Sequence, residues 1–448
     1  MKTVKFITLG CKVNQYDTQT IREQFASAGF KEIDNGRDAD IYVINTCTVT
    51  SSADRKSRYF IHYAHRQNPK ARIIVTGCYA TLDSDEIAKI PGVTRIIKNQ
   101  DKNRIVEILN EHNGQKGLDG PNGIGISNFS GHTRAFIKIQ DGCNNFCSYC
   151  KVPKVRGVSR SKPLDEIAQE ANRLVRNGFK ELVLCGICLG SYGKDLPPHQ
   201  IWCGGLQSQT NLINVIEALE KIEGLLHIRL SSIEAGDISD ELINKMTHSK
   251  KLCRHLHIPI QSGDDEILKK MNRNYCREDY LDLIKKIKNN IPEIAITTDV
   301  LVGFPGEKED NFQNTVDLVR EIMPLRVHIF PYSKRLGTPA AILKDKINPL
   351  VIKERISRLA SVSKTCALDY KKQFLNKDRD VLIEERSKEN NKYWGGYTDN
   401  YIKVRIKSDK NLKNQLIRVR LKKISEATTY GAIADISCKA ELIPHHFI

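Results

Sequence analysis

The pattern of apolar and polar positions divides the chain into distinct regions. In residues 1–110, three short β-branched runs alternate with helix-length segments, which predicts a parallel α/β sheet. These runs are Val4–Leu9, Ile41–Thr46 and Ile73–Thr76. Six further strand and helix units between residues 132 and about 335 predict a barrel or partial barrel, a fold whose site lies at the carboxyl ends of the strands.

The expected barrel strands are Ala135–Ile139, Leu182–Leu184, His227–Ser231, His255–Ile260, Ile294–Val302 and Arg326–Phe330. After about residue 376, short alternating strands separated by polar turns, the last of them Ala432–Ile436, predict a small β-barrel. The first expected helix of the N-terminal region is Tyr16–Ala28, and the first of the large barrel is Leu164–Arg176. We therefore expect an α/β chain with a parallel α/β domain over residues 1–115 and a linker over 116–131. A partial (β/α)6 barrel should follow over 132–367, and the small β-barrel over 368–448.

Composition and charge narrow the class of protein. Hydrophobic residues at 40% and charged residues at 27% exclude a largely disordered or fibrous chain. No apolar run approaches ~18 residues, so no membrane span is expected. The net charge of +17 favours a polyanionic partner, nucleic acid ahead of a membrane surface, with a merely basic enzyme as the alternative. Residues 368–448 hold 17 Lys and Arg against 11 Asp and Glu, so we place the main polyanion contact there.

The cysteines point to metal chemistry. There are thirteen, and the first apolar stretch is too short for an export signal, so we expect a cytoplasmic protein whose clustered thiols bind metal or react. Cys143, Cys147 and Cys150 form a Cys-x3-Cys-x2-Cys run just past an expected strand. Three thiolates can hold three corners of an iron–sulfur cubane and leave the fourth iron open to a small molecule. A three-ligand zinc site is the alternative.

A second group of cysteines is distributed along the chain. Cys11, Cys47 and Cys78 each follow one of the three N-terminal strands. Because parallel strands run the same way, all three thiols should emerge at one edge of the sheet, where open α/β sheets place ligands. Three converging thiolates again suit a cluster with one open iron. The alternative is three unrelated cysteines.

The Cys143–Cys150 run resembles the signature of radical S-adenosylmethionine enzymes, and with both triads the chain resembles the methylthiotransferases of that superfamily. The resemblance covers nearly the whole length: a methylthiotransferase domain, a radical domain and a C-terminal TRAM domain, an RNA-binding β-barrel similar here over Gly396–Val404. Leu9–Thr18, Leu189–Gly193 and His255–Gly263 are most similar to the branch that acts on N6-threonylcarbamoyladenosine in tRNA. Sister branches act on isopentenyladenosine in tRNA or on a ribosomal protein, and their openings after the first cysteine differ from Lys12–Gln15.

The resemblance implies a division of labour between two [4Fe–4S] clusters. The Cys143/Cys147/Cys150 cluster would bind S-adenosylmethionine, generate a 5′-deoxyadenosyl radical and abstract hydrogen from C2 of adenine 37, beside the anticodon. The Cys11/Cys47/Cys78 cluster would present sulfur, methylated by a first S-adenosylmethionine, so two cofactor molecules are consumed per 2-methylthio product. A reducing electron donor and a sulfur source are also implied. The alternatives are methylthiolation of another target and a non-catalytic RNA-binding iron–sulfur protein.

Candidate cofactor contacts come from Tyr149, beside the third thiolate of the run, and from the ends of the barrel strands. The strand-end candidates are Gly186, Ser232, Glu234, Gln261, Ser262, Arg273, Asp299 and Gly303. For Arg273 the alternative is a solvated helix end. The chain departs from the family pattern at Lys151, at Cys188, where relatives of this branch typically have His, and in residues 197–208.

Overall fold

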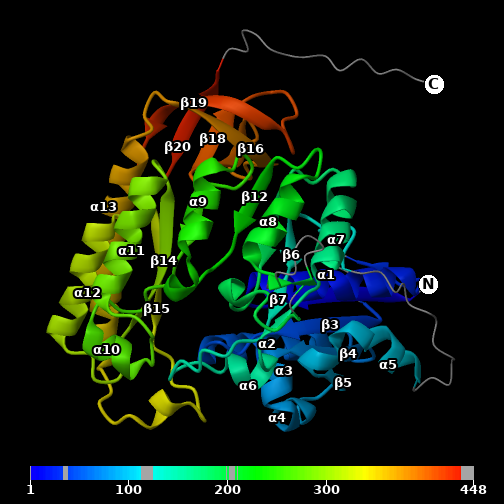
Figure 1. Cartoon of the computed structure of the whole chain (residues 1–448). Helices are drawn as coiled ribbons and strands as arrows, with labels where there is room; N and C mark the ends of the chain where they lie inside the picture. The colour runs from blue at the N-terminus through cyan, green and yellow to red at the C-terminus, as the bar shows by residue number, and fades with distance from the viewer. Residues whose placement is uncertain are drawn as a thin grey trace, which may run out of the picture.

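Five parallel strands form the N-terminal sheet, in the order β2-β1-β3-β4-β5. In the computed structural model, which describes residues 2–33, 39–111, 125–197, 199–200, 207–208 and 210–434, this sheet lies at one end of a larger barrel (Figure 1). Its strands are β1 (Thr3–Thr8), β2 (Lys31–Glu32), β3 (Ile41–Thr46), β4 (Arg72–Gly77) and β5 (Val93–Ile97). Its helical segments are α1 (Lys12–Ser27), α2 (Ser51–Gln67), α3 (Cys78–Leu82), α4 (Ser84–Ala88), η1 (Asn99–Arg104) and α5 (Ile105–Glu111).

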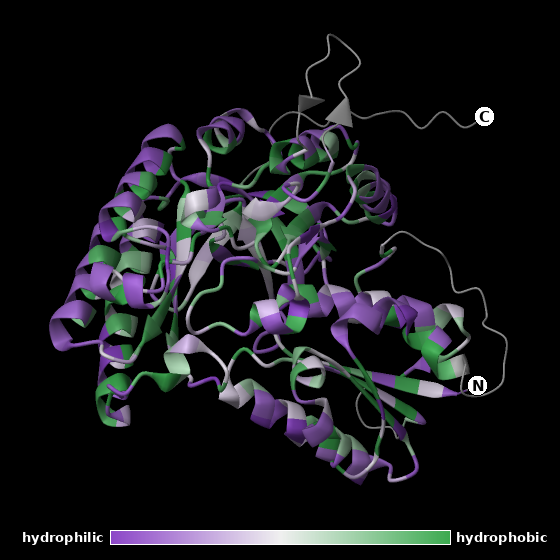
Figure 2. Cartoon of the chain, turned by 60° about the horizontal axis from the view of Figure 1, so that its bottom comes forward, coloured by the Kyte–Doolittle hydropathy of each residue, from purple (hydrophilic) through white to green (hydrophobic). Residues whose placement is uncertain are grey.

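The central position of β3 in the sheet explains why its first four residues, 41–44, form an apolar run. Tyr42 and Ile44 pack on one face of the sheet with Ile61 of α2, and Ile41 and Val43 pack on the other with Ile21 of α1. Every residue of β3 is buried, as expected for a parallel strand covered on both faces. Figure 2 shows the same arrangement as hydrophobic colour along the strands and hydrophilic colour on the outer sides of the helices.

Six parallel strands build the partial barrel, as the sequence predicted. They are β6 (Arg134–Lys138), β9 (Glu181–Cys185), β12 (His227–Leu230), β13 (His255–His257), β14 (Ala295–Val302) and β15 (Arg326–Pro331). Two three-stranded sheets, β12-β9-β6 and β13-β14-β15, are joined by the isolated bridges Ile228–Leu252 and Ser232–His257. The helices outside them are α7 (Leu164–Arg176), α8 (Leu212–Glu220), α9 (Asp240–His248), α10 (Asp265–Lys270), α11 (Arg277–Asn290), α12 (Glu309–Ile322) and α13 (Pro349–Lys372).

Smaller elements complete this region. They are β7 (Gln140–Asp141), α6 (Val152–Arg156), β8 (Arg160–Ser161), η2 (Leu189–Ser191), β10 (His199–Gln200), β11 (Gln207–Ser208), η3 (Ala235–Asp237) and η4 (Pro339–Ile342). The largest apolar core lies between the strands and the helices, where Val300 packs with residues such as Ile284 and Phe312. Burying each such side chain contributes roughly 1.5–3 kcal/mol. Among the described residues, no helix has the length and apolarity that a membrane span requires.

A closed five-stranded barrel ends the described chain. Its strands are β16 (Asp378–Arg386), β17 (Tyr393–Thr398), β18 (Lys403–Lys407), β19 (Leu416–Ile424) and β20 (Thr429–Ile433), in the order β16-β17-β18-β20-β19. It lies at the end of the large barrel away from the N-terminal sheet (Figure 1). Arg229 of β12 donates to the carbonyl oxygens of Thr398 (3.2 Å) and Asp399 (2.9 Å), and Arg134 pairs with Glu384 (2.5 Å).

Several sequence predictions were wrong in detail. β13 was expected to continue to Ile260 but ends at His257, because Pro259 has no N–H to donate and Gln261 has a positive φ of 65°. α1 begins four residues before the expected Tyr16, since its N-cap, Cys11, makes no side-chain capping bond that would mark the start. The last strand was expected at Ala432–Ile436 and is Thr429–Ile433. β2, β5 and β17 were missed. Most of the expected linker and of the 197–208 segment lies outside the described residues.

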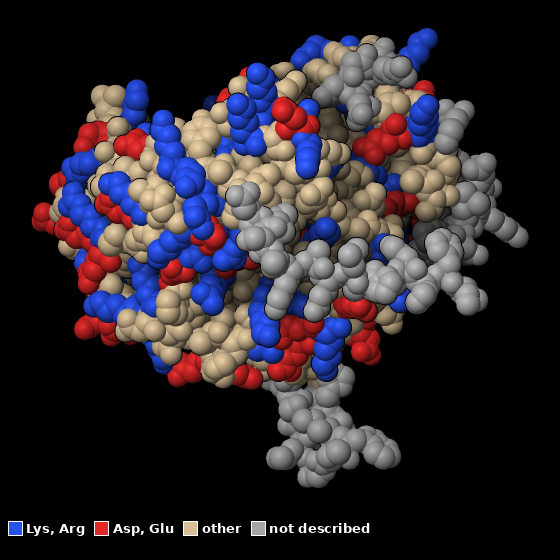
Figure 3. Space-filling model, turned by 90° about the horizontal axis from the view of Figure 1, so that it is seen from above, with Lys and Arg blue, Asp and Glu red and all other residues tan. Residues whose placement is uncertain are grey.

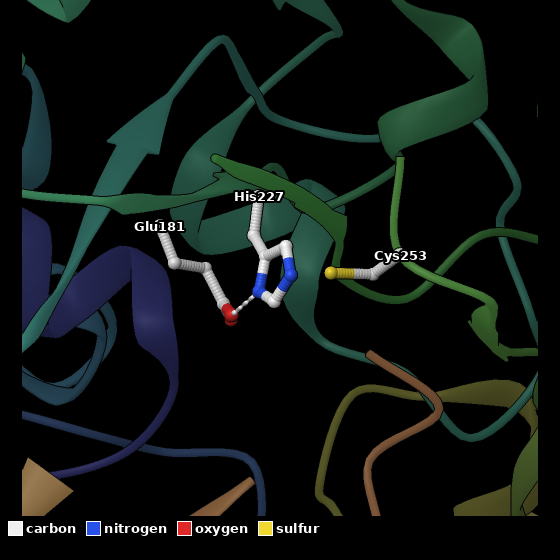
Figure 4. A group of neighbouring side chains, drawn as sticks. All are labelled: Glu181, His227 and Cys253. Carbon is white, nitrogen blue, oxygen red and sulfur yellow. Dashed lines mark hydrogen bonds and ion pairs between the residues drawn. The ribbon is translucent and has the colours of Figure 1, made fainter. Parts of the chain in front are cut away.

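A buried ion cluster closes the base of the barrel. Glu181 accepts from Arg229 (2.8 Å), lies 3.6 Å from Arg134 and contacts His227 Nδ1 (3.1 Å). Figure 4 shows the side chains of Glu181, His227 and Cys253 pointing toward one another, and their possible metal-ligand atoms lie within 4.8 Å of one another. Two guanidinium groups already neutralise this carboxylate, so the cluster is better explained as an ion-pair network than as a cation site.

We expect Glu181→Gln to lower the free energy of unfolding by about 3 kcal/mol, because it leaves buried Arg229 without its charged partner. Burial opposes ionisation, but Arg229, His227 and Arg134 hold the pKa of Glu181 below its ordinary value of 4.5. Its stabilisation is therefore complete above about pH 4.5 and is lost as the pH falls below that. Urea unfolding at pH 7 and at pH 4 would measure this. Glu389→Gln, at an exposed pair with Arg405, should change stability by less than about 1 kcal/mol.

Candidate functional site

The structure brings Cys11, Cys47 and Cys78 together at the carboxyl ends of neighbouring strands. Cys11 precedes α1, Cys47 follows β3, and Cys78 begins α3 directly after β4. Gly10 is packed so closely on Cys47 that an added Cβ would lie 3.0 Å from its Sγ. Burial raises the pKa of Cys47 to about 11, and the neighbouring charges of Cys78 and Cys11 act in the same direction. Cys11 and Cys78 therefore lie close enough to Cys47 for their charges to affect its pKa.

Asn14 holds two of these loops in place. Its Nδ2 donates to the carbonyl oxygens of Leu9 (2.7 Å) and Thr46 (2.9 Å), which come just before Cys11 and Cys47. Asn45 Nδ2 donates in turn to Asn14 O (2.9 Å). The bonds are buried or partly buried, so the spacing of the two cysteines is fixed by the first turn of α1.

The second triad lies on the loop after β6. Backbone N–H groups of Asn145 and Val152 donate to the sulfurs of Cys143 and Cys150, each over 3.4 Å. Burial raises the pKa of Cys150 to about 12, with Cys147 and Cys143 adding to the rise. Arg273 Nη1 donates to Cys147 Sγ over 3.3 Å. N–H donors of this kind stabilise thiolates that hold an iron–sulfur cluster.

Cys188 places a fourth thiol beside this triad. A hydrogen bond from Cys188 is the main cause that lowers the pKa of Cys143 to about 7. Cys188 Sγ also lies 3.1 Å from Ser191 Oγ and 3.5 Å from Asp237 Oδ2, and its interaction with Cys143, together with burial, raises its own pKa. Cys188, a departure from the family pattern, is therefore a buried thiol held against the radical triad.

A buried ion cluster joins the elements that carry the two triads. Asp17 of α1 accepts from Lys138 of β6 (2.5 Å) and Lys102 of η1 (2.9 Å). Arg156 of α6 lies 3.3 Å from Asp17 and 2.9 Å from Asp141. Although burial opposes it, the three cations hold the pKa of Asp17 far below its usual range. Sequence analysis missed this cluster, for which the only signal was charge at Lys138 within an apolar strand.

Two further contacts connect the triads. Arg156 Nη2 donates to Asn14 Oδ1 (2.5 Å), the residue that holds the loops of the first triad. Asn99 Nδ2 donates both to Cys78 Sγ (3.6 Å) and to the carbonyl of Val155 (2.8 Å), just after the second triad. The carboxyl edge of the N-terminal sheet therefore faces the carboxyl mouth of the barrel.

The expected cofactor contacts begin with a buried pair. Arg273 forms an ion pair with Glu234 and its side chain is only 4% exposed, so the alternative of a solvated helix end is wrong. Tyr149 packs edge-on against Phe304, with ring centroids 6.5 Å apart, in a small core beside the triad. Gly186 approaches Gln140 so closely that an added Cβ would lie 2.8 Å from its Oε1.

The remaining candidates follow β12, β13 and β14. Ser232 bridges to His257, Gln261 N–H donates to Asp299 O (2.9 Å), and Ser262 Oγ lies 3.4 Å from Thr315 Oγ1. Gly303 has a φ of +80° and its N–H donates to Glu307 Oε2 (2.8 Å). The Asp299 carboxylate contacts His257 Nε2 over 3.1 Å. Their contacts with S-adenosylmethionine stay a prediction.

Comparisons with known proteins agree with this geometry. Residues 3–98 match the family model described as uncharacterized protein family UPF0004, and residues 137–319 match the radical SAM superfamily. The chain is 41% identical over 436 residues, 94% of each chain, to the threonylcarbamoyladenosine tRNA methylthiotransferase MtaB of Bacillus subtilis. It is 35% identical over 452 residues to the tRNA-2-methylthio-N(6)-dimethylallyladenosine synthase of Acetivibrio thermocellus, covering 95% of this chain and 90% of that protein.

Among solved structures, the radical S-adenosylmethionine methyltransferase TsrM of Kitasatospora setae superposes with a TM-score of 0.52. The match covers 76% of this chain and 75% of TsrM at 14% identity, which shows a shared fold alone.

We expect Gly10→Ala to reduce the iron content of anaerobically reconstituted protein from about eight to about four atoms per chain, because a Cβ would displace Cys47 and spare the second triad. Gly29→Ala is the matched control: its φ of +80° is also positive, but nothing lies within 4 Å of an added Cβ. Iron and sulfide counting would measure the effect. Full loading of the Gly10 variant would show that the contact with Cys47 does not govern the first triad.

Proposed function

The chain belongs to the radical S-adenosylmethionine methylthiotransferase family, and we propose that it methylthiolates C2 of N6-threonylcarbamoyladenosine 37 in tRNA. The product is 2-methylthio-N6-threonylcarbamoyladenosine. The observation that supports the proposal is the pair of thiol triads on elements joined by Arg156, which contacts Asp17 and Asn14 of α1 and Asp141 beside Cys143. The choice of substrate is supported by the 41% identity with a relative named for threonylcarbamoyladenosine.

In this proposal the two triads hold different groups. The radical superfamily implies one [4Fe–4S] cluster and S-adenosylmethionine, for which Cys143, Cys147 and Cys150 provide three thiolates. Cys11, Cys47 and Cys78 would hold a second cluster. When bound, the first cluster with S-adenosylmethionine supplies a 5′-deoxyadenosyl radical, and the second supplies sulfur for the product.

The protein's own contribution is placement. Arg273 orients Cys147 and is itself fixed by Glu234, and the ion cluster of Asp17 fixes α1 on the barrel. Both groups must flank one base, and a displacement of about 1 Å can reduce a rate about 100-fold. Two molecules of S-adenosylmethionine are consumed per product, and a reducing electron donor and a sulfur source complete the reaction in the cytoplasm.

The proposed RNA partner is the tRNA anticodon loop, bound in part by the C-terminal barrel. Figure 3 views the molecule from the side of this barrel and shows Lys and Arg side chains over much of the face. On β18, Lys403, Arg405 and Lys407 alternate on the outer side of the strand, and the two lysines are exposed. Such a basic surface attracts phosphates without selecting sequence.

Nucleoside analysis tests the function directly. tRNA from a strain that lacks the gene should contain N6-threonylcarbamoyladenosine without its 2-methylthio form, and the cloned gene should restore that form. Loss of the 2-methylthio form of isopentenyladenosine instead would favour the second candidate, which the relative from Acetivibrio thermocellus supports. Absence of 5′-deoxyadenosine from reduced, fully loaded protein would indicate a non-catalytic iron–sulfur protein.

Cysteine variants in the same strain separate the roles of the triads. Cys143→Ala should abolish both cofactor cleavage and methylthiolation, because it removes a thiolate of the radical triad. Cys47→Ala should retain part of the cleavage, measured as 5′-deoxyadenosine in vitro, and should abolish the product. Product formation by Cys47→Ala would contradict the division between the triads.

Replacing Lys403 and Lys407 together by Gln should weaken tRNA binding several-fold and make the plot of log Kd against log salt shallower by about one to two units. Fluorescence titration from 50 to 300 mM salt would measure it. Replacing Lys285 and Lys286 of α11, which pair with Glu321 and Asp240, is the matched control. An unchanged salt slope would place the RNA contact elsewhere.

A further inference from the structure

The loop after β15 reaches from the large barrel to the N-terminal sheet. Its residue Arg335 is only 5% exposed, although it belongs to no helix or strand. Arg335 Nη2 donates to Thr48 Oγ1 (2.7 Å), while Nη1 pairs with Asp54 Oδ2 (2.6 Å) and donates to Ser51 Oγ (3.3 Å). Thr48 directly follows Cys47 of the first triad. A buried cation of the barrel domain is therefore inserted beside the Cys47 loop.

The contacts of Arg335 form a closed network. Thr48 Oγ1 accepts from Arg335 and donates to Asp54 Oδ1 (2.7 Å), so each oxygen of this carboxylate has a partner. Ser51 N–H donates to Ser333 Oγ (3.0 Å), two residues before Arg335. The side chains of Arg335, Thr48 and Asp54 are buried. Because separating a buried ion pair leaves a charge without its partner, a displacement of Arg335 from the Cys47 loop is costly.

The other end of this segment is attached to the loop of the second triad. Ala340 N–H donates to the carbonyl oxygen of Ser148 (2.8 Å), the residue directly after Cys147. Ala340 is buried in a small apolar core with Met271 and Phe304. Ser148 is also held by its own N–H, which donates to the carbonyl oxygen of Met271 (2.9 Å). The second attachment is therefore as well packed as the first.

The chain between the two attachments is short and folded. The five peptide units from Arg335 to Ala340 would span at most about 18 Å when fully extended. They span less than that, because the N–H (3.1 Å) and Oγ1 (2.7 Å) of Thr338 both donate to the carbonyl oxygen of Arg335 and close a turn. Gly337, inside this turn, has a φ of +80°, which favours glycine. One short, internally bonded piece of chain therefore connects the loops of the two triads.

This connection shares no residue with the Asp17 cluster. That cluster joins α1 and η1 of the N-terminal domain to β6 and α6. Arg335 instead joins the loop after β3 and the start of α2 to the loop after β15. A single attachment would leave the N-terminal sheet free to rotate about it, whereas two attachments on different elements remove much of that freedom.

We propose that residues 333–340 form a strap that sets the distance between the two cluster sites, and that Arg335 is its positioning residue. This inference rests on the proposed function, in which both groups must flank one adenine. A displacement of about 1 Å can reduce a rate about 100-fold. With a loosened strap, one-electron cleavage of S-adenosylmethionine to methionine and the 5′-deoxyadenosyl radical would continue. The radical would then take its hydrogen atom from another C–H bond instead of from adenine, and no sulfur would be transferred.

Arg335→Gln tests the inference in the fully loaded protein. Reduced [4Fe–4S] clusters are paramagnetic, and their dipolar interaction falls with the inverse cube of the distance between them. We expect electron paramagnetic resonance to show a weaker or more broadly distributed interaction in the variant than in the wild type, at an unchanged content of about eight iron atoms per chain. The ratio of 5′-deoxyadenosine to methylthiolated tRNA should rise at least tenfold.

Arg379→Gln is the matched control. Arg379 of β16 pairs with Glu293, just before β14, so it also joins two domains through a partly buried ion pair, but at the end of the large barrel away from the triads. Its replacement should leave both measurements at their wild-type values.

Thr48→Val provides a second test at the same contact. It removes the acceptor of Arg335 Nη2 and keeps the ion pair with Asp54, so it should change both measurements in the same direction by a smaller factor. This milder change keeps the test decisive if Arg335→Gln does not fold.

The outcomes separate the strap from the proposed function. An unchanged dipolar interaction in Arg335→Gln and Thr48→Val, with both clusters loaded, would overturn the strap and leave the function standing. Equal losses of 5′-deoxyadenosine and product, which leave their ratio unchanged, would overturn the positioning role and show that Arg335 only stabilises the fold. Wild-type protein that loads two clusters and methylthiolates no tRNA would overturn the function, while the dipolar interaction would still decide whether Arg335 sets the distance.

Discussion

The architecture depends on the buried charges of Asp17, Lys102, Lys138, Arg156 and Asp141. They come from five separate elements of two domains, and the desolvation cost of each charge is offset only by its partners. Loss of one partner would leave a buried charge unpaired, which is strongly destabilising. The cluster therefore restricts how α1 can be placed on the barrel. The loops of the first triad are joined to this cluster through Asn14, and Asn99 joins Cys78 to the carbonyl of Val155, next to Arg156.

The parts of the fold that could be predicted are those with a local signal. β3 is buried on both faces, and its first four residues are apolar, while α7 was predicted with its observed bounds because its apolar positions recur with helical spacing. The convergence of Cys11, Cys47 and Cys78 required one more step: parallel strands deliver their carboxyl ends to the same edge. β2 has two residues and β17 contains Gly395 and Gly396, so neither gave a readable alternation.

The parts that could not be predicted involve partners distant in the sequence. Lys138 and Asp17 are 121 residues apart, and no periodicity relates them. Arg273 was assigned two possible environments, and only the fold shows that Glu234 buries it. Asp299 was selected by its place on a strand, but only the fold shows that its carboxylate contacts His257 of the neighbouring strand.

A small C-terminal barrel is the kind of module that can be exchanged between proteins. Here Arg229 donates to backbone carbonyls at the turn after β17, and its guanidinium lies 4.6 Å from the Tyr401 ring centroid while it also neutralises Glu181. A chimera joined after α13 would therefore need this turn to match a new host, so substitutions in the large barrel and in the small barrel are constrained by each other.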